Sequence, residues 1–463
     1  MTRVTPPELP THPDLPTARR VAPFYEQWLP AVIEWIVARY EADPGYRFLD
    51  TKYDVPGRRD FAADDPFRGK SAVFGWIQGR GLESLVVHAE WLTQVQAAAS
   101  YRDLVGRINR VVDSLSQTLS EVRERNAGRM FFLMDRDGSP RFDGGAPAVR
   151  DHYSFADIFC AKGLYAAAHH RADEPGLRQA RDYLVAIAES LGEFRFRSLQ
   201  FKPGLPASND DPRLVRQEGP FMIFLGALAL MAEREGGGWC TRAGLRIIDR
   251  ILSCHTASAD MPPLARRGDM WETVDEYDRP LLHDGRLQSD PGHSIEFVGI
   301  ASRFLRAIER REGLEARDAE RIRAARARLP DLLFANFENG FRSDVEGITK
   351  TVDLVSRDPV DPTLPWWSLP ETMRAAAQVL VDHSGDDGSA SVGERCRALF
   401  ALCHNALVRR YLVPGNPALW VQTRSADGRT VDVVPACPDV DPGYHTNLSI
   451  IEALGLFDEV RLS

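Results

Sequence analysis

The sequence SDPGHSIEFVGIASRFL, residues 289–305, is the stretch that decides the fold. It begins as helices begin, because Asp290 can cap the first turn with a side-chain oxygen and Pro291 can occupy the first helical position, where no N–H is needed. Apolar residues then cover nearly every side, which is typical of a helix buried by other helices. His293 and Glu296 lie three residues apart and project from the same side. An imidazole and a carboxylate at the exposed end of a buried helix predict acid/base chemistry there.

The same helical periodicity extends along the chain from about residue 23. It predicts about twelve helices, in the ranges 25–40, 73–98, 101–123, 152–170, 177–191, 220–234, 241–253, 293–308, 316–334, 371–381, 393–411 and 444–456. Long loops follow the odd-numbered helices and short turns follow the even-numbered ones, with a repeat of roughly 60 to 85 residues. Each repeating unit is therefore a helix, a long loop, a second helix and a short turn.

Local motifs support this repeat. Residues 134–139 (MDRDGS) and 423–429 (TRSADGR) both resemble the turn of a short hairpin. The helix start at residues 290–293 (DPGH) is echoed at residues 441–445 (DPGYH), and a further helix starts from proline at residues 365–367 (PWW). Corresponding helices therefore begin with similar chemistry in different repeats.

Six such helical hairpins can close into a ring, so the sequence predicts an all-α (α/α)6 barrel, a toroid of about twelve helices with the long loops on one rim. An open solenoid of helical pairs is the alternative. Closure is favoured, because the strongly apolar even-numbered helices need neighbours on every side.

The composition limits the class of protein. Of 463 residues, 44% are hydrophobic and 27% are charged, as in ordinary soluble globular proteins. A net charge of −9 without a basic stripe argues against nucleic-acid binding, and no apolar run approaches the roughly 20 residues that span a membrane. Six scattered cysteines and a start without an apolar signal core predict a cytoplasmic protein. We expect a flexible segment over residues 1–20, a single catalytic barrel over residues 21–463, and no metal site.

In a closed ring, the starts of the even-numbered helices surround a central pocket. Aromatic faces stack under the C–H face of a sugar and polar groups bind its hydroxyls. The candidate sugar-binding residues are Trp76, Gln78, Trp366, Trp367, Tyr444 and Asn447. Each has a plainer interpretation: a tryptophan pair is more often core, and Gln78 could cap a neighbouring turn.

The candidate proton-transfer residues are His293 and His445, because two imidazoles from different helices can act as base and acid around one carbon. Such a pair can remove the proton next to an aldehyde or ketone and return it to the other face or to the neighbouring carbon. Glu296 and Glu371 would orient the imidazoles, and Arg80 would stabilise the enediolate oxygen. Arg80 could instead be a buried ion-pair partner of Glu83.

Four motifs resemble the N-acylglucosamine 2-epimerase superfamily, which includes cellobiose 2-epimerases and mannose isomerases. They occur in the family's order, as WIQGR (residues 76–80), GHSIEF (292–297), WWSLPE (366–371) and GYHTN (443–447). The resemblance implies an (α/α)6 barrel with His293 and His445 as the acid/base pair. It also implies ring opening and a cis-enediol intermediate without a metal or redox cofactor. The implied supporting and sugar-lining residues are Arg80, Glu296, Glu371 and Trp366 or Trp367.

The chain departs from the family pattern at two places. Family members usually carry a histidine followed by a glutamate on the sixth helix, where this chain has Ile223 and Gly226. An arginine after the C-terminal histidine is also absent, since Leu448 and Ser449 follow Asn447. These departures leave open which sugar is used, and whether the reaction is an epimerisation or an isomerisation.

The sequence therefore predicts a cofactor-independent sugar 2-epimerase or aldose–ketose isomerase that acts on a free mono- or disaccharide. A homodimer is compatible with the sequence. One alternative is a glycoside hydrolase of the unsaturated glucuronyl hydrolase type, whose acid and base would be sought among Asp151, Asp157, Glu296 and Glu371. The other is a barrel that binds carbohydrate without catalysis.

Overall fold

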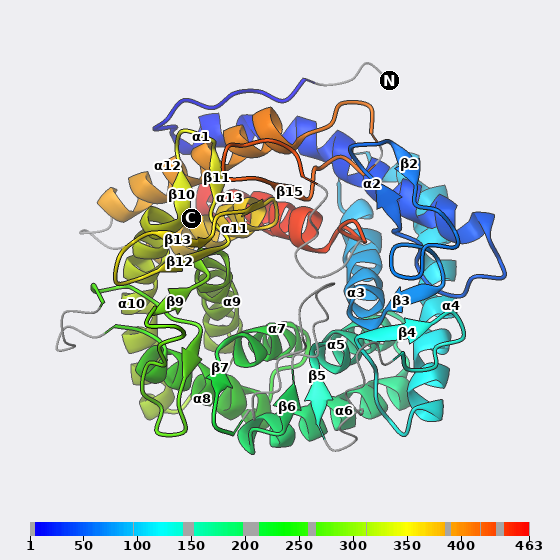
Figure 1. The fold of residues 1–463 in the computed structure, drawn as a ribbon, viewed down its shortest axis with the longest axis horizontal. Helices are drawn as coiled ribbons and strands as arrows, with labels where there is room; N and C mark the ends of the chain where they lie inside the picture. The colour runs from blue at the N-terminus through cyan, green and yellow to red at the C-terminus, as the bar shows by residue number, and fades with distance from the viewer. Residues whose placement is uncertain are drawn as a thin grey trace.

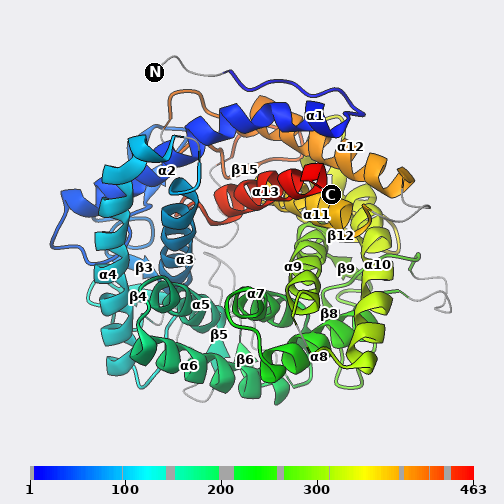
Figure 2. The same cartoon turned by 180° about the vertical axis from the view of Figure 1, so that it is seen from behind.

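The computed structural model of the chain describes residues 5–95, 97–141, 152–197, 213–257, 265–311, 313–384, 390–416, 418–431 and 439–462. Within these residues, twelve long helices form two concentric rings (Figures 1 and 2). The outer ring consists of α2 (Ala22–Ala42), α4 (Arg102–Arg125), α6 (Glu174–Gly192), α8 (Gly238–Cys254), α10 (Ala316–Gly340) and α12 (Ala390–Ala406). The inner ring consists of α3 (Gly75–Leu92), α5 (Phe155–His170), α7 (Gly219–Arg234), α9 (Pro291–Glu309), α11 (Ser368–Asp382) and α13 (Ser449–Leu462). The predicted (α/α)6 barrel is confirmed.

The inner ring is closed. Each inner helix from α3 to α13 contacts the next inner helix along the chain. The ring closes where a π-helical turn, Tyr444–Leu448, leads into α13 and contacts α3. There the Asn447 side-chain amide donates to His88 Nε2 at 2.9 Å and to the Leu29 carbonyl at 3.3 Å. The closed arrangement gives the apolar inner helices neighbours on every side, which an open solenoid would not.

The two rings differ in sequence because they differ in burial. In the inner helix α7, residues 219–232 are all buried, and this segment is almost entirely apolar. The outer helix α4 buries one face only, at three- and four-residue spacing. That face consists of Leu104, Ile108, Val111, Val112, Leu115, Thr118, Leu119 and Val122. The core therefore lies between the rings.

Short strands organise the long connections, which lie on the face turned to the viewer in Figure 1. A strand just before an inner helix pairs with a strand from the next long loop, which ties neighbouring repeats together. These pairs are β3 (Ala72–Phe74) with β4 (Leu133–Asp135), β5 (Tyr153–Ser154) with β6 (Phe196–Arg197), β7 (Arg216–Gln217) with β8 (Thr273–Val274), β9 (Gln288–Ser289) with β12 (Thr351–Asp353), and β14 (Leu364–Pro365) with β15 (Thr423–Arg424). Only β5 and β6 are parallel among them. The remaining strands are β1 (Tyr53–Asp54), β2 (Arg59–Asp60), β10 (Phe341–Arg342), β11 (Gly347–Ile348) and β13 (Pro359–Asp361).

The hairpins predicted from residues 134–139 and 423–429 are confirmed. Asp135 N–H donates to the Ser139 carbonyl, and Ser425 N–H to the Arg429 carbonyl, both at 2.8 Å. The helix predicted from residue 73 starts two residues later, because residues 72–74 belong to strand β3. β-branched and aromatic side chains favour a strand there over the first turn of a helix.

The Pro-rich segment that we expected to be flexible packs against the barrel over its described residues. Leu9 is buried, and its N–H and carbonyl bond to the Asn405 side chain at 2.9 and 2.8 Å. The Pro7 carbonyl lies 2.8 Å from His404 Nε2. A short helix, α1 (Leu15–Ala18), then leads to α2 through a 3-10 turn. Backbone hydrogen bonds to α12 thus hold this segment in place.

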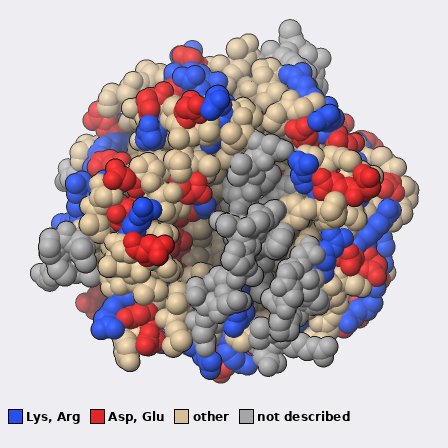
Figure 3. Space-filling model, viewed as in Figure 1, with Lys and Arg blue, Asp and Glu red and all other residues tan. Residues whose placement is uncertain are grey.

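In the described part of the chain, each helix is too short or too polar to cross a membrane. On the face shown in Figure 3, the described acidic and basic side chains are interspersed.

Candidate active site

His293 lies in the first turn of α9, where the sequence places it. Asp290 caps this helix: its Oδ1 accepts from the N–H groups of Gly292 and His293 at 3.0 and 3.3 Å. Gly292 is required at this position, because a Cβ there would lie 2.6 Å from the ring of Trp367. The cap therefore fixes the backbone of His293, and the glycine lets the indole of Trp367 approach it.

His445 occupies the equivalent position in another repeat, in the turn that leads into α13. Asp441 Oδ1 accepts from the N–H groups of Tyr444 and His445 at 2.7 and 3.2 Å, and its Oδ2 accepts from Thr446 N–H at 2.9 Å. In both DPG motifs, the aspartate thus accepts a hydrogen bond from the backbone N–H of the histidine that follows it.

Both imidazoles line one cavity of about 500 Å³. Each packs against the indole of Trp367, with ring centroids 5.5 Å apart for His293 and 5.4 Å apart for His445. Trp76 and Trp366 also line this cavity, and Trp366 Nε1–H donates to Thr446 Oγ1 at 3.0 Å. The structure therefore brings the two predicted histidines and the three predicted tryptophans together around a space large enough for a small ligand.

The environment of His445 keeps its imidazole neutral. Burial, followed by the Arg80 guanidinium, lowers the pKa of His445 to about 3. Its Nδ1 lies 2.8 Å from Glu371 Oε1, so the carboxylate holds the ring proton on Nδ1 and leaves Nε2 as the nitrogen with a free lone pair. Glu371 is itself buried and paired with Arg374. Burial raises the pKa of Glu371 to about 7, although Arg374 opposes this rise.

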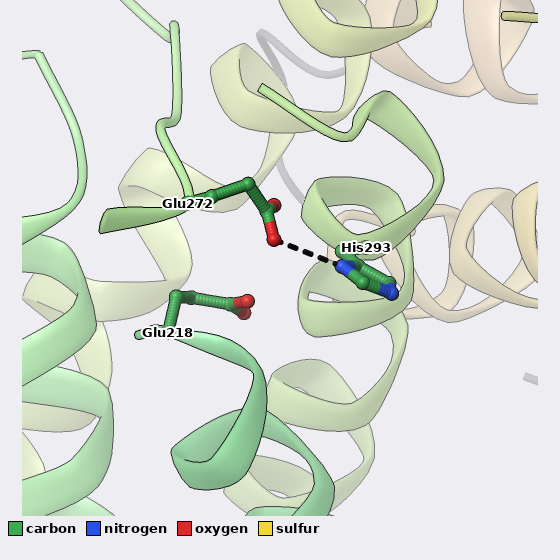
Figure 4. Close-up of side chains that lie close together, drawn as sticks. All are labelled: Glu218, Glu272 and His293. Carbon is green, nitrogen blue, oxygen red and sulfur yellow. Dashed lines mark hydrogen bonds and ion pairs between the residues drawn. The ribbon is translucent and has the colours of Figure 1, made fainter. Parts of the chain in front are cut away.

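The environment of His293 has the opposite effect. Burial lowers its pKa, but the carboxylates of Asp290 and Glu272 outweigh burial, and the pKa of His293 is raised above its ordinary value. Its Nδ1 lies 3.1 Å from Glu272 Oε2 (Figure 4). The same atom lies 3.4 Å from Asp290 Oδ2. Two histidines on one cavity with opposite pKa shifts suit a base and an acid.

Arg80 and Glu296 complete the charged lining. The Arg80 guanidinium packs over the rings of Trp76 and Phe159, at 4.5 and 4.2 Å from their centroids. Its buried Nε has no hydrogen-bond partner among the described residues, so it can donate to a ligand oxygen. Burial, followed by the charge of Glu371, raises the pKa of Glu296.

Three predicted sugar-binding residues do not line the cavity. The amide of Gln78 bonds to the backbone N–H and carbonyl of Leu49 at 2.7 and 3.2 Å, and the amide of Asn447 bonds across the closure of the inner ring. The Tyr444 hydroxyl accepts from Lys162 at 3.0 Å, although its ring also contacts Arg80. Buried backbone groups, His88 and a buried lysine use the polar atoms of these three side chains.

Arg80 does not form the ion pair with Glu83 that the sequence left open. Lys162 pairs with Glu83 instead, at 2.8 Å.

Three other positions were singled out in the sequence, namely Ile223, Asp157 and Asp151. Ile223 lines the cavity, so an apolar side chain occupies that part of the wall. Asp157 is buried away from the cavity. Its Oδ1 accepts from Tyr183 Oη–H at 2.6 Å and from Met130 N–H at 2.9 Å, so its carboxyl group is used in structural hydrogen bonds. Asp151 lies outside the described residues.

Several cavity residues that the sequence did not predict come from the long loops, above all Glu272 and Lys350. Lys350 pairs with Asp290, beside His293. A weak signal was present for Glu272, because it lies just before a third hairpin, in which Asp275 N–H donates to the Arg279 carbonyl at 2.9 Å. The same kind of turn occurs in the two predicted hairpins, so it could have indicated that Glu272 lies on the rim that carries the long loops.

Among the described residues, two groups of side chains could hold a metal ion, namely Glu218 with Glu272 and His293, and Glu296 with Glu371 and His445.

No protein-family model matches this chain, and no curated protein matches it. Solved structures do match this chain, over most of its length. A cellobiose 2-epimerase from Bacillus thermoamylovorans is 13% identical, with a TM-score of 0.60, and the match covers 91% of this chain and 99% of that one. A cellobiose 2-epimerase from Spirochaeta thermophila is 12% identical, with a TM-score of 0.60, over 93% and 98% of the two chains. A D-mannose isomerase is 13% identical, with a TM-score of 0.56, over 91% and 97%. At these identities the likeness establishes a shared fold, and it agrees with the resemblance of the four sequence motifs.

Proposed function

We propose that the protein is a sugar 2-epimerase or aldose–ketose isomerase that acts on the open-chain form of a free mono- or disaccharide. One observation carries the proposal: two imidazoles from equivalent helix starts face the same tryptophan-lined cavity. Carboxylates contact the Nδ1 atoms of both rings, which leaves the two Nε2 atoms for the ligand.

The first step uses His445 as the base. Its neutral Nε2 removes the proton from C2 of an open-chain aldose, and the electron pair of the broken C–H bond forms a double bond between C1 and C2. The carbonyl electrons move to O1, which becomes the enediolate oxygen. Arg80 lines the cavity with an Nε–H that is unpaired among the described residues, and we assign it the role of stabilising that oxygen. Glu371 stabilises the imidazolium that forms on His445.

The second step uses His293 as the acid. A proton delivered to C2 from the opposite face re-forms the C1 carbonyl and gives the 2-epimer. A proton delivered to C1 gives the ketose once the hydroxyl proton of O2 has moved to O1, so that C2 becomes the carbonyl carbon. One proton leaves the sugar and one returns, so the reaction needs no net oxidant or reductant. The tryptophans would hold the sugar by stacking under its C–H face.

The test is a nuclear magnetic resonance screen of free aldoses and ketoses in deuterated water, which reports the substrate and the exchanged position together. We expect deuterium to enter C2 with wild-type protein, and His445→Ala and His293→Ala each to abolish that exchange. His170→Ala is the control, because His170 bonds to Asn109 at the far end of α5. Full exchange in either active-site variant would refute its role.

The same screen separates the alternatives. Release of a reducing end from a disaccharide without exchange at C2 would indicate a hydrolase. Saturable binding of a sugar with neither exchange nor cleavage across the screen would indicate a carbohydrate-binding barrel.

A further inference from the structure

Glu218 is a buried carboxyl that the proposed reaction does not use. It lies directly before α7, is fully buried, and neither of its side-chain oxygens has a hydrogen-bond partner among the described residues. Burial, followed by the charges of Glu272 and Glu296, raises its pKa well above the ordinary value. A buried carboxyl without a partner is unfavourable for folding, so something that binds it would relieve that penalty.

The side chain of Glu218 points toward Glu272 and His293 (Figure 4). One carboxylate oxygen from each glutamate and one nitrogen of His293 all lie within 4.8 Å of one another. Backbone contacts fix this arrangement: Glu218 N–H donates to the Glu272 carbonyl at 2.9 Å, and Glu272 Oε1 accepts from Asp290 N–H at 3.3 Å. Three donors from three separate segments therefore converge on one point.

The size of the gap and its burial limit the occupant. A ligand that all three donors can reach at once must be about one atom in size, and the buried oxygens of Glu218 are closed to a sugar. A zinc-type ion binds carboxylate oxygen and imidazole nitrogen at about 2.0–2.2 Å in tetrahedral geometry, which places its donors about 3.3–3.6 Å apart. Small side-chain rotations would bring the group to that spacing.

Charge supports a divalent ion. Lys350 pairs with Asp290, so the carboxyl groups that remain for the ion are those of Glu218 and Glu272, and a carboxyl group that binds a metal ion does so without its proton. An imidazole together with carboxylates favours a transition metal over Mg²⁺ or Ca²⁺, which prefer oxygen donors alone.

The second group of possible ligands differs in this respect. There Glu371 already has a cation, Arg374, and a hydrogen bond to His445. The Arg374 guanidinium therefore already compensates the charge of Glu371, which a metal ion would otherwise do.

We propose that Glu218, Glu272 and His293 form a binding site for a divalent transition-metal ion of the zinc type. This site goes beyond the proposed sugar reaction, which needs no metal. A metal ion and a proton on Nδ1 of His293 exclude each other, so the metal-free protein is the form that the proposed proton transfer uses.

The experiment titrates the full-length, metal-free protein with Co²⁺, followed by its visible absorption, and with Zn²⁺, followed by calorimetry. We expect one equivalent to bind, and Glu218→Gln to weaken binding at least about tenfold. Glu218→Gln should fold, because it only removes an unpaired buried acid. Glu296→Gln is the matched control from the second group and should bind the ion as wild type does.

Two results would refute the proposed metal site. One is the absence of saturable Co²⁺ and Zn²⁺ binding up to about 1 mM. The other is binding that Glu218→Gln leaves unchanged, including binding that only Glu296→Gln weakens. These binding measurements use no sugar, so their outcome does not depend on whether the protein is an epimerase.

Discussion

Replacing Glu371 by glutamine tests how the buried carboxylate supports His445. When His445 removes a proton it becomes positively charged, and Glu371 Oε1 lies 2.8 Å from its Nδ1. Charge centres about 4 Å apart attract by about 4 kcal/mol at an effective dielectric constant of about 20. Glutamine still accepts the hydrogen bond but carries no charge. Because each 1.36 kcal/mol is a factor of ten in rate, we expect Glu371→Gln to slow C2 exchange by about 10²- to 10³-fold.

The assay is the rate of deuterium incorporation at C2, with thermal unfolding measured in parallel. Glu371→Gln also leaves Arg374 buried without its carboxylate, which costs about 3–5 kcal/mol of stability. The double variant Glu371→Gln/Arg374→Met removes both charges and should regain thermal stability while exchange stays slow. A single variant that folds and exchanges within about threefold of wild type, a change of only about 0.7 kcal/mol in the barrier, would contradict the reasoning.

Three further outcomes follow from the structure. The exchange rate should fall as the pH drops below about 7, because Glu371 has a raised pKa and its ionised form is lost below it; a pH–rate profile that is flat from about pH 5 to 8 would contradict this. Gly79→Ala should destabilise the protein by about 1–3 kcal/mol, because the added Cβ would lie 2.3–2.5 Å from backbone atoms of α5; Gly192→Ala, which meets nothing within 4 Å, is the control in the same melting experiment. Lys162→Met should cost about 3–5 kcal/mol by leaving Glu83 buried and unpaired, and a second change of Glu83→Gln should restore most of the melting temperature.

The geometry of the closure explains why some predicted site residues became structural. Gln78 and Asn447 lie beside true cavity residues in their motifs, yet their amides satisfy buried backbone groups and His88. Neighbours on a helix point in different directions, so a motif can place one residue in the cavity and the next in the wall. A sequence motif alone does not separate the two.

The sequence by itself determined the twelve helices, the proline-led caps at Asp290 and Asp441, two of the rim hairpins and the closed barrel. These features follow from local chemistry: the period of apolar residues, the fixed φ of proline and the capping power of aspartate act over a few residues. The sequence also placed His293 and His445 at equivalent helix starts, because the repeat relates them.

Only the tertiary structure decided which charges meet in the cavity. Glu218 and Glu272 come from separate long loops, and nothing in their local sequence shows that both approach His293. The opposite pKa shifts of His293 and His445 also depend on burial and on charges brought from distant segments. Electrostatic energy depends on distance in space and on exclusion of water, and both are properties of the folded ring rather than of any one segment.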